Sequence, residues 1–322
     1  MVTRDVFLRW KGNPIFTTDR LPFKSNGVFN PGVALVDGEV VLLLRIEDQE
    51  GTSHLRVARS ANGVDHWRLA DKPLLDKGLP EYPFEEWGCE DPRITPIGDH
   101  KWIIAYTAYS RYGPAVGLAA TEDFEKVQRL GIALSPSNKD ATVFPHRIDG
   151  RWFMLHRPVT GAGEHIWYAS TDDDDFSHWG QAGVLFPERG GPWWDGLRVG
   201  VGAPPIATDE GWLLIYHGVK ETTERPIYRL GLALLDTNDP RRVLERSHRW
   251  VFGPEAPYEQ QGLAANVVYT CGAVVRDDEV WMYYGAADTS IGLAVAKLRD
   301  LLAFVHEQDT VSREGRYLGM IH

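Results

Sequence analysis

The feature that most constrains this chain is an internal repeat of about sixty residues. Five strand-like runs rich in β-branched and aromatic residues recur: Glu39–Asp48, Lys101–Ser110, Arg151–Pro158, Gly211–Lys220 and Val280–Thr289. Each follows a second such run across a turn, and each precedes a third that carries an alanine in an apolar setting. These alanines are Ala58, Ala119, Ala169, Ala233 and Ala294, spaced 61, 50, 64 and 61 residues apart. Several strands per unit at this period are typical of radially repeated β-sheets.

The repeat predicts an all-β fold, a five-bladed β-propeller with a short C-terminal helix. We expect residues 1–322 to form a single catalytic domain, with segment 1–28 adding an outer strand to the last blade and closing the ring. Leu298–Glu307 has the apolar spacing of a short amphipathic helix. Pro-rich loops separate the repeats, where connections between blades belong: Pro80–Trp87, Pro187–Trp194 and Pro254–Tyr258.

Composition narrows the class of partner. The formal net charge is −11, from 34 basic and 45 acidic residues, which argues against a nucleic acid because phosphate backbones need a basic field. Two cysteines, Cys89 and Cys271, cannot build a disulfide framework, and no CxxC spacing indicates a metal site. The N-terminus lacks the apolar region of a signal peptide, and no apolar run has membrane-spanning length. We therefore expect a cytoplasmic protein without nucleic-acid, membrane or metal partners.

Equivalent positions of five blades would converge on one axis, so the polar residues at the strand ends form one candidate site. Two kinds of chemistry separate among them. The first is a set of carboxylates: Glu47, Asp48, Asp91 and Asp288. The second is a set of basic groups: Lys139, Arg157, Arg198 and His217. The basic set suits a small anion such as phosphate, and the carboxylates suit sugar hydroxyls and proton transfer to a glycosidic oxygen.

Taken singly, each residue also fits a structural role. Asp91 could begin a turn before Pro92, His217 could be a satisfied core histidine, and Asp288 could cap a turn through its side chain. Arg157 and Arg198 could pair with acidic neighbours. Their shared register across the repeats favours a common site.

Several ordered motifs together resemble glycoside hydrolase family 130, the β-mannoside phosphorylases and their hydrolytic relatives, which are five-bladed propellers. The resemblance runs from about Asn30 to Ala303. It rests on the segments FNPGVA, LRIED, CEDPRIT, NKDATVFP, MLHRP, RVGVGAPPI, LLIYHG and AADTSIGLA.

The resemblance implies a role for each site residue. Asp91 matches the family's general acid, which is thought to protonate the leaving oxygen through the mannose 3-hydroxyl. Phosphate then attacks from the opposite face and gives α-mannose 1-phosphate with inversion. Phosphate binding falls to Lys139, Arg157, Arg198 and His217. Substrate binding falls to Asn30, Arg45, Glu47, Arg93, Tyr228 and Asp288.

Two positions depart from the family's best-known β-1,4 enzymes, which carry arginine where this chain has Lys139 and lysine where it has Arg198. The swap keeps the total charge, so phosphate binding should survive. It moves the chain away from the β-1,4 subgroups and slightly favours a β-1,2-linked mannoside, with β-1,4 kept as an alternative.

Three functions stay in competition. An inverting phosphorylase needs only cationic positioning of phosphate, whereas an inverting hydrolase needs a second carboxylate to activate water, for which Glu90 and Asp140 are the candidates. Because all four basic groups are present, the sequence favours a phosphorylase with phosphate as co-substrate and no cofactor. A non-catalytic carbohydrate-binding propeller is the third alternative. A homo-oligomer is also conceivable, through the N-terminal segment or the terminal helix.

Overall fold

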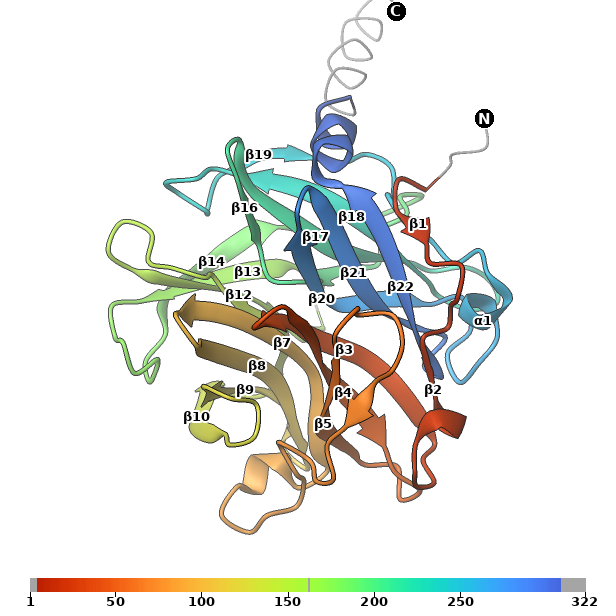
Figure 1. The fold of residues 1–322 in the computed structure, drawn as a ribbon. Coiled ribbons are helices and arrows are strands. Elements are labelled where there is room, and N and C mark those ends of the chain that lie inside the picture. The colour runs from red at the N-terminus through yellow and green to blue at the C-terminus, as the bar shows by residue number, and fades with distance from the viewer. Residues whose placement is uncertain (1–4, 162, 308–322) are drawn as a thin grey trace, which may run out of the picture.

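The computed structural model describes residues 5–161 and 163–307. It is an all-β protein with few helices, in which nearly every strand pairs with an antiparallel neighbour (Figure 1). Short helices lie in the connections: η1 (Thr18–Arg20), η2 (Pro83–Glu85) and α1 (Pro257–Gln260).

The strands fall into five antiparallel groups that follow one another along the chain. The first holds β3 (Gly27–Val36), β4 (Glu39–Glu47), β5 (Ser53–Ser60) and β6 (Arg68–Leu69). The second holds β7 (Gly88–Gly98), β8 (Lys101–Ser110), β9 (Gly113–Thr121) and β10 (Gln128–Leu134). A single parallel pairing, Ser53 with Gly88, joins these two groups into one eight-stranded sheet.

The remaining three groups are separate sheets. The third holds β11 (Asn138–Val143), β12 (Trp152–Pro158), β13 (Ile166–Thr171) and β14 (Gly180–Phe186). The fourth holds β15 (Arg198–Val201), β16 (Ile206–Thr208), β17 (Gly211–Lys220), β18 (Ile227–Leu235) and β19 (Val243–Arg246). The fifth holds β20 (Val268–Arg276), β21 (Glu279–Ala286) and β22 (Ser290–Lys297), to which β1 (Leu8–Arg9) and β2 (Phe16–Thr17) add at the β22 edge.

The five alanines that define the repeat occupy one position in all groups. Ala58, Ala119, Ala169, Ala233 and Ala294 are 0–1% exposed. Each pairs with an apolar residue of the preceding strand, respectively Leu42, Ile104, Met154, Leu214 and Met282. Ala58, Ala119, Ala233 and Ala294 each belong to a buried cluster of apolar side chains. The repeat read from the sequence is therefore confirmed in register as well as in period.

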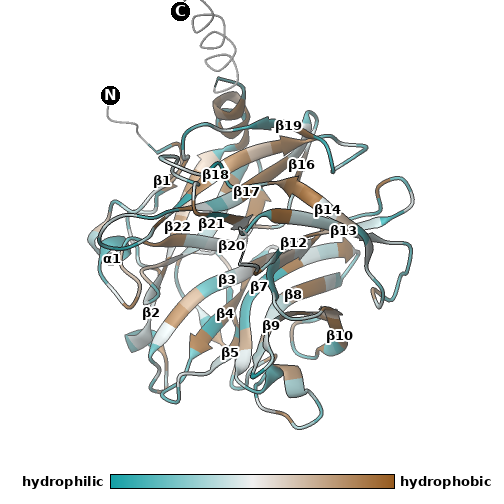
Figure 2. Cartoon of the chain, turned by 180° about the vertical axis from the view of Figure 1, so that it is seen from behind, coloured by the Kyte–Doolittle hydropathy of each residue, from teal (hydrophilic) through white to brown (hydrophobic). Residues whose placement is uncertain are grey.

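Five clusters of buried apolar side chains hold the groups together. One lies between each consecutive pair of groups, and the fifth joins the last group to the first through residues such as Val28, Leu42, Tyr283 and Leu293. Apolar residues gather in the strands, whereas the longer loops are mainly hydrophilic (Figure 2). Burial of apolar surface between sheets thus provides most of the stabilisation.

The first strands of the groups also meet. β3 contacts both β20 and β7, and β11 contacts both β7 and β15. Glycines permit the closest approaches: a Cβ on Gly32 would lie 2.8 Å from the Pro92 carbonyl oxygen, and one on Gly272 would lie 2.7 Å from the Val33 nitrogen. Side chains from different groups are therefore brought within reach of one another.

Buried acids fix three of the loops between groups. Glu85, Asp195 and Glu259 are 0–2% exposed, and each accepts hydrogen bonds from a tyrosine of a neighbouring second strand and from an arginine. The pairs are Tyr106 and Arg129 with Glu85, Tyr216 and Arg246 with Asp195, and Tyr284 and Arg9 with Glu259. The Pro-rich loops at these boundaries are thus tied down at one end.

Residues 298–307 are helical, as their apolar spacing predicts. Leu301 and Val305 are fully buried in the cluster that contains Phe7 and Val251. One predicted strand was too long: β21 ends at Ala286, because Ala287 and Asp288 take left-handed φ values of 48° and 53° and start the turn to β22. Among the described residues, no helix is long and apolar enough to cross a membrane.

Candidate active site

The first strands of the five groups are irregular at corresponding places. Register shifts occur in β3 between Phe29 and Gly32, in β7 between Glu90 and Arg93, in β11 between Lys139 and Thr142, and in β20 between Thr270 and Gly272. In the fourth group the strand breaks between β15 and β16. A bulge leaves a residue unpaired and re-aims its side chain. The re-aimed residues include Asn30, Asp91 and Asp140.

Asp91 and Asp140 adopt the left-handed conformation at their bulges, with φ values of 48° and 52°. Asp enters this region more readily than most residues. The backbone therefore explains why an acid is tolerated at both places, and both carboxylates are buried, at 3% and 0% exposure.

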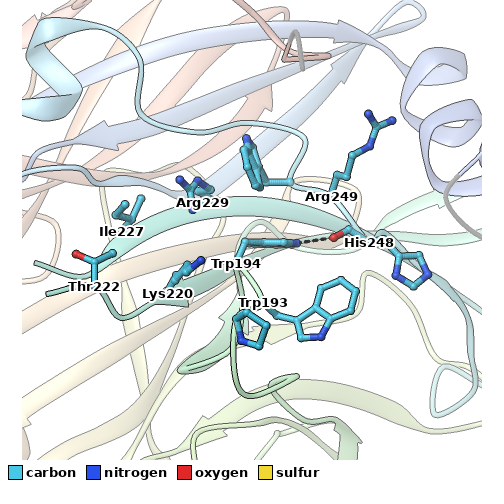
Figure 3. A pocket seen from close by; sticks show the side chains of 10 residues that line it. Trp193, Trp194, Lys220, Thr222, Ile227, Arg229, His248 and Arg249 are labelled. Atoms are coloured by element: carbon cyan, nitrogen blue, oxygen red, sulfur yellow. Dashed lines mark hydrogen bonds between the residues drawn. The ribbon is translucent and has the colours of Figure 1, made fainter. Parts of the chain in front are cut away.

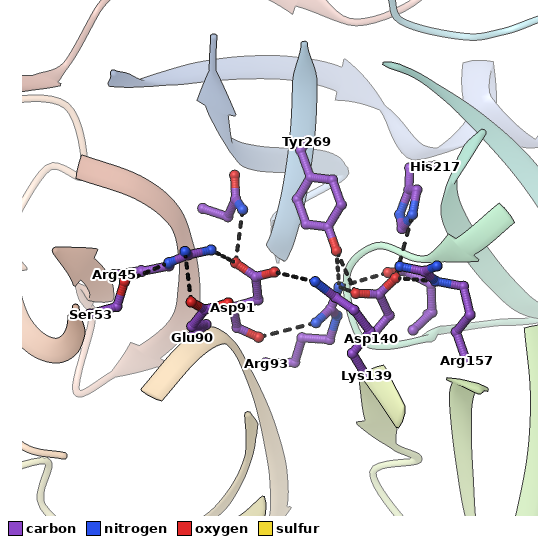
Figure 4. A network of polar contacts seen from close by, with 12 residues as sticks. Arg45, Ser53, Glu90, Asp91, Arg93, Lys139, Asp140, Arg157, His217 and Tyr269 are labelled. Carbon is purple, nitrogen blue, oxygen red and sulfur yellow. Dashed lines mark hydrogen bonds and ion pairs between the residues drawn. The ribbon is translucent and has the colours of Figure 1, made fainter. Parts of the chain in front are cut away.

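The Asp91 carboxylate lies at the centre of a polar network (Figure 4). Its Oδ1 accepts hydrogen bonds from Asn30 Nδ2 at 3.0 Å and from Arg45 Nη1 at 2.9 Å. Its Oδ2 lies 3.8 Å from Lys139 Nζ. Burial alone would raise the pKa of Asp91, but the positive charges of Arg45 and Lys139 outweigh it and the pKa lies below its ordinary value. The carboxylate is therefore ionised in the protein without ligands.

A second group of acids faces Arg45. The guanidinium Nη2 of Arg45 lies 3.0 Å from Glu90 Oε1, and its Nε donates to Ser53. Burial raises the pKa of Asp288 to about 6, with opposition from Arg45 and a further rise from the charge of Asp91. The charges of Arg45, Asp91 and Lys139 therefore act on Asp288.

Glu47 is the last residue of β4 and Asp48 is the next residue, but their surroundings differ. Glu47 is partly exposed, and its Oε1 accepts a hydrogen bond from Asn26; its charge acts on Asp288. Asp48 instead caps its own turn, since it accepts from the backbone of Glu50 and Thr52 and pairs with Lys77. Asp48 therefore stabilises its own turn, and among the described residues no hydrogen bond or ion pair joins it to Asp91; its place among the candidate site carboxylates stays a prediction.

The basic residues gather on the other side of Lys139, around Asp140. Asp140 Oδ2 accepts from Arg157 Nε at 2.7 Å, and Oδ1 accepts from the Tyr269 hydroxyl at 2.8 Å. Burial alone would raise the pKa of Asp140, but Arg157 and the other cations hold it well below its usual range. Asp140 thus fixes the guanidinium of Arg157.

Arg198, at the start of β15, joins this cluster through Glu164, a residue that no sequence pattern singles out. Arg157 Nη1 contacts Glu164 Oε2, and Arg198 Nη1 lies 3.4 Å from Glu164 Oε1. The Arg157 side chain is 6% exposed and that of Arg198 is 30% exposed. One carboxylate therefore bridges two of the four predicted anion-binding groups.

His217 is buried beside Asp140. Its Nε2 lies 3.5 Å from Asp140 Oδ2, and its ring packs against Tyr269 at 4.6 Å and Tyr228 at 6.2 Å between centroids. Burial lowers the pKa of His217 to about 3, so the ring is neutral and the contact with Asp140 is not an ion pair. Gly200 makes room for it, because a Cβ there would lie 2.3 Å from the imidazole Cε1.

Arg93 lies beneath the site. It is 1% exposed, and its guanidinium donates to the carbonyls of Gly202 at 2.7 Å, Val201 at 2.8 Å and Asp91 at 3.1 Å, and to Tyr269. These bonds tie the second group to the fourth and fifth. Its position favours support of the site over the substrate contact that was predicted.

The structure thus connects seven predicted residues, with the Asp91 carboxylate on one side and a cationic cluster on the other: Asn30, Arg45, Asp91, Lys139, Arg157, Arg198 and His217. Tyr228 packs against His217, and Glu47 and Asp288 are related to this network only through their charges. Tyr269 was missed, although it follows the first-strand register of the other groups; Glu164 lies in a loop without a pattern. Among residues 5–161 and 163–307, no group of three or more His, Cys, Asp or Glu could hold a metal ion.

Comparison with known proteins identifies the family of this chain. The family model of glycoside hydrolase family 130, described as beta-1,4-mannooligosaccharide phosphorylase, matches residues 3–307. This chain belongs to glycoside hydrolase family 130. Among family 130 proteins, the beta-1,2-mannobiose phosphorylase of Listeria innocua is 36% identical, over 91% of this chain and 97% of that protein. The beta-1,4-mannooligosaccharide phosphorylase of Ruminococcus albus is 30% identical, over 96% and 93% respectively.

The fold agrees with this assignment to family 130. The structure of the Listeria innocua enzyme in complex with beta-1,2-mannobiose superposes with a TM-score of 0.85 at 33% identity. It covers 93% of this chain and 99% of that chain. The expected family is therefore confirmed.

Proposed function

We propose that this chain is an inverting β-mannoside phosphorylase. It cleaves a short β-1,2-linked mannooligosaccharide with inorganic phosphate and yields α-mannose 1-phosphate. The observation that carries the proposal is the continuity of the network: Lys139 lies 3.8 Å from Asp91, and the next residue, Asp140, binds Arg157. A proton-transferring carboxylate and an anion-binding cluster are thus neighbours.

In this proposal Lys139, Arg157 and Arg198 bind phosphate, with His217 and Tyr228 at the inner edge of the cluster. Cationic positioning is sufficient for attack, because phosphate is itself a nucleophile. Asn30, Arg45, Glu47 and Asp288 bind the mannose that is transferred. Arg93 holds the strands that carry these groups.

Asp91 is the general acid. It is ionised in the free protein because of Arg45 and Lys139, so it must gain its proton in the complex. A phosphate anion beside Lys139 would cancel part of the charge that stabilises the carboxylate and would raise its pKa. The mannose 3-hydroxyl, as in the family's mechanism, would relay that proton to the leaving oxygen.

Hydrolysis is the second candidate, and the geometry favours it less. An inverting hydrolase needs a second carboxylate that is able to activate water. The two candidates are engaged elsewhere: Asp140 with Arg157 and Tyr269, and Glu90 with Arg45. The relatives reported above are named phosphorylases, one for β-1,2 and one for β-1,4 linkages, and the Lys139 and Arg198 exchange supports the β-1,2 assignment.

We also propose that the five strand groups are the blades of a propeller. In this proposal, residues 1–322 form one domain. The apolar cluster between the fifth and first groups and the pairing of β1 and β2 with β22 support it. Phosphate is the only co-substrate proposed. A cytoplasmic location and a homo-oligomeric state stay predictions.

A direct assay tests the function. The protein is incubated with β-1,2-mannobiose or β-1,4-mannobiose, with and without phosphate, and α-mannose 1-phosphate is measured by ³¹P NMR. We expect phosphate-dependent product, formed faster from the β-1,2 substrate. Release of free mannose at the same rate without phosphate would show a hydrolase instead.

A further inference from the structure

The contact of Glu164 with Arg157 and Arg198 goes beyond the family's general mechanism. We propose that Glu164 is a resident counter-anion of the phosphate site, which occupies its guanidinium groups in the free enzyme and is displaced when phosphate binds. This inference rests on the proposed function, because it deepens the role of the same site.

The geometry of the carboxylate supports this role. Its two oxygens contact two different guanidinium groups, those of Arg157 and Arg198. A phosphate held by the same two arginines would present two oxygens in the same manner. The carboxylate and phosphate therefore compete for the same two guanidinium groups.

The charges of the cluster lead to the same conclusion. His217 is neutral, so Lys139, Arg157 and Arg198 bring three positive charges. Asp140 binds Arg157, Asp91 faces Lys139, and Glu164 contacts Arg157 and Arg198. With Glu164 in place each of these three cations already faces a carboxylate, so a phosphate dianion has to compete for Arg157 and Arg198. Displacement of Glu164 frees both guanidinium groups for the ligand.

The position of Glu164 allows its carboxylate to move away from Arg157 and Arg198. It follows β12 in the connection to β13, at the same end as Arg157, and its side chain is 18% exposed, whereas Asp140 is fully buried. Asp140 is also held by Tyr269 from another group. Of the two acids that contact Arg157, Glu164 is therefore the one that can be exchanged for a ligand.

The test uses Glu164→Gln, which keeps the shape of the side chain and removes its charge. Binding of inorganic phosphate is measured by calorimetry, and the KM for phosphate is measured in phosphorolysis. We expect phosphate to bind about tenfold more tightly, equivalent to about 1.4 kcal/mol, with an unchanged KM for mannobiose. Glu221→Gln, an exposed acid that directly follows β17, removes the same charge and should leave phosphate affinity unchanged.

Weaker or unchanged phosphate binding by Glu164→Gln would overturn the inference, since it would make Glu164 a residue that only positions the arginines. Glu164→Asp, which is too short to bridge both, serves as a second variant and should bind phosphate more tightly than the wild type. Calorimetry separates this result from the proposed function: a wild type that binds phosphate but forms no mannose 1-phosphate would refute the function alone.

An independent observation concerns a pocket of about 460 Å³ that is lined by residues of β17 and β18 and of the loops beside the fourth group (Figure 3). Trp193, Trp194 and Trp250 line it together with Lys220, Arg229, His248 and Arg249. No carboxylate lines it, in a chain whose net charge is −11. We infer that this pocket binds a phosphorylated hexose at a second site.

Arg229 is the residue that most favours an anionic ligand in this pocket. Its guanidinium stacks over the Trp250 ring at 4.2 Å, and burial lowers its pKa, with only a partial opposing effect from Asp5. Among the described residues, neither the Arg229 nor the Lys220 side chain has a hydrogen bond or an ion pair. A phosphate group would satisfy both cations, and Trp193, which is 39% exposed, offers an apolar surface to a pyranose ring.

Calorimetry with α-mannose 1-phosphate tests this second site. We expect two molecules per chain for the wild type and one for Arg229→Ala or Lys220→Ala, with unchanged phosphorolysis at low ligand concentration. Arg225→Ala, an exposed cation of the same region, should keep two. A stoichiometry of one for the wild type would refute the site.

Discussion

The substitution Asp91→Asn separates the catalytic role proposed for Asp91 from its structural role. The asparagine carbonyl oxygen can accept both hydrogen bonds now made to Oδ1, from Asn30 at 3.0 Å and from Arg45 at 2.9 Å. The ion pairs with Arg45 at 2.9 Å and with Lys139 at 3.8 Å both lose their charge, but Arg45 keeps Glu90 as an ionic partner. Because the pKa of Asp91 is lowered from 3.8 to about 2, we expect the free energy of unfolding to fall by about 2 kcal/mol at neutral pH.

Turnover should respond much more strongly. Loss of a general acid costs roughly 10²- to 10⁴-fold in rate when the leaving group needs a proton. The assay compares β-1,2-mannobiose with 4-nitrophenyl β-mannoside, whose leaving group departs as a stable anion. We expect the large loss with mannobiose and a loss of less than about tenfold with the aryl mannoside.

The comparison contains its own control, because both substrates place mannose in the same position. Equal losses with the two substrates would show that Asp91 orients the sugar and does not supply the proton. Wild-type turnover with mannobiose would remove Asp91 from the chemistry altogether.

Three further predictions follow from the contacts described above. Arg157→Ala should raise the KM for phosphate by about tenfold or more, since a charged hydrogen bond to an anion contributes about 1.5–3 kcal/mol; initial rates at varied phosphate check this, and an unchanged KM would exclude Arg157 from the phosphate site. Asp288 has a raised pKa of about 6, so its contribution to stability is present below its ordinary pKa and is lost as pH rises through 6. Asp288→Asn should therefore raise the free energy of unfolding by about 3 kcal/mol at pH 7.5, with a higher Tm, but not at pH 4. An equal shift in Tm at both pH values would contradict the reasoning. Asp195→Ala should destabilise the fold by about 3–5 kcal/mol in urea unfolding, because it leaves buried arginines unpaired, whereas Asp278→Ala, which breaks an exposed pair with Lys297, should cost less than about 1 kcal/mol.

Much of the fold was predictable because each repeat has recognisable local sequence patterns. Alternating apolar residues and turn chemistry located the second strands, and β8 and β17 have the predicted limits. The alanines Ala58 to Ala294 gave the register between groups. The end of β21 was misplaced because Ala287 and Asp288 adopt left-handed φ values that a strand-like composition does not reveal.

The site was predictable only in part. Residues at equivalent strand positions, such as Asp91, Lys139 and Arg157, were found because the repeat aligns them. Arg93 could not be distinguished from a ligand-binding arginine, since its depth depends on the carbonyls of Val201 and Gly202 in another group. Glu164 was missed for the same reason: its partners come from separate segments, and its loop has no periodic pattern.

The bulges in the first strands have a consequence for how such a protein can diversify. Each one releases a single residue from the hydrogen-bonding ladder, so a substitution there alters one functional group without disturbing the pairing above and below it. Chemistry is therefore distributed as one adjustable side chain per module, and a new substrate can be accommodated by exchanging residues at these few positions while the architecture that carries them stays intact.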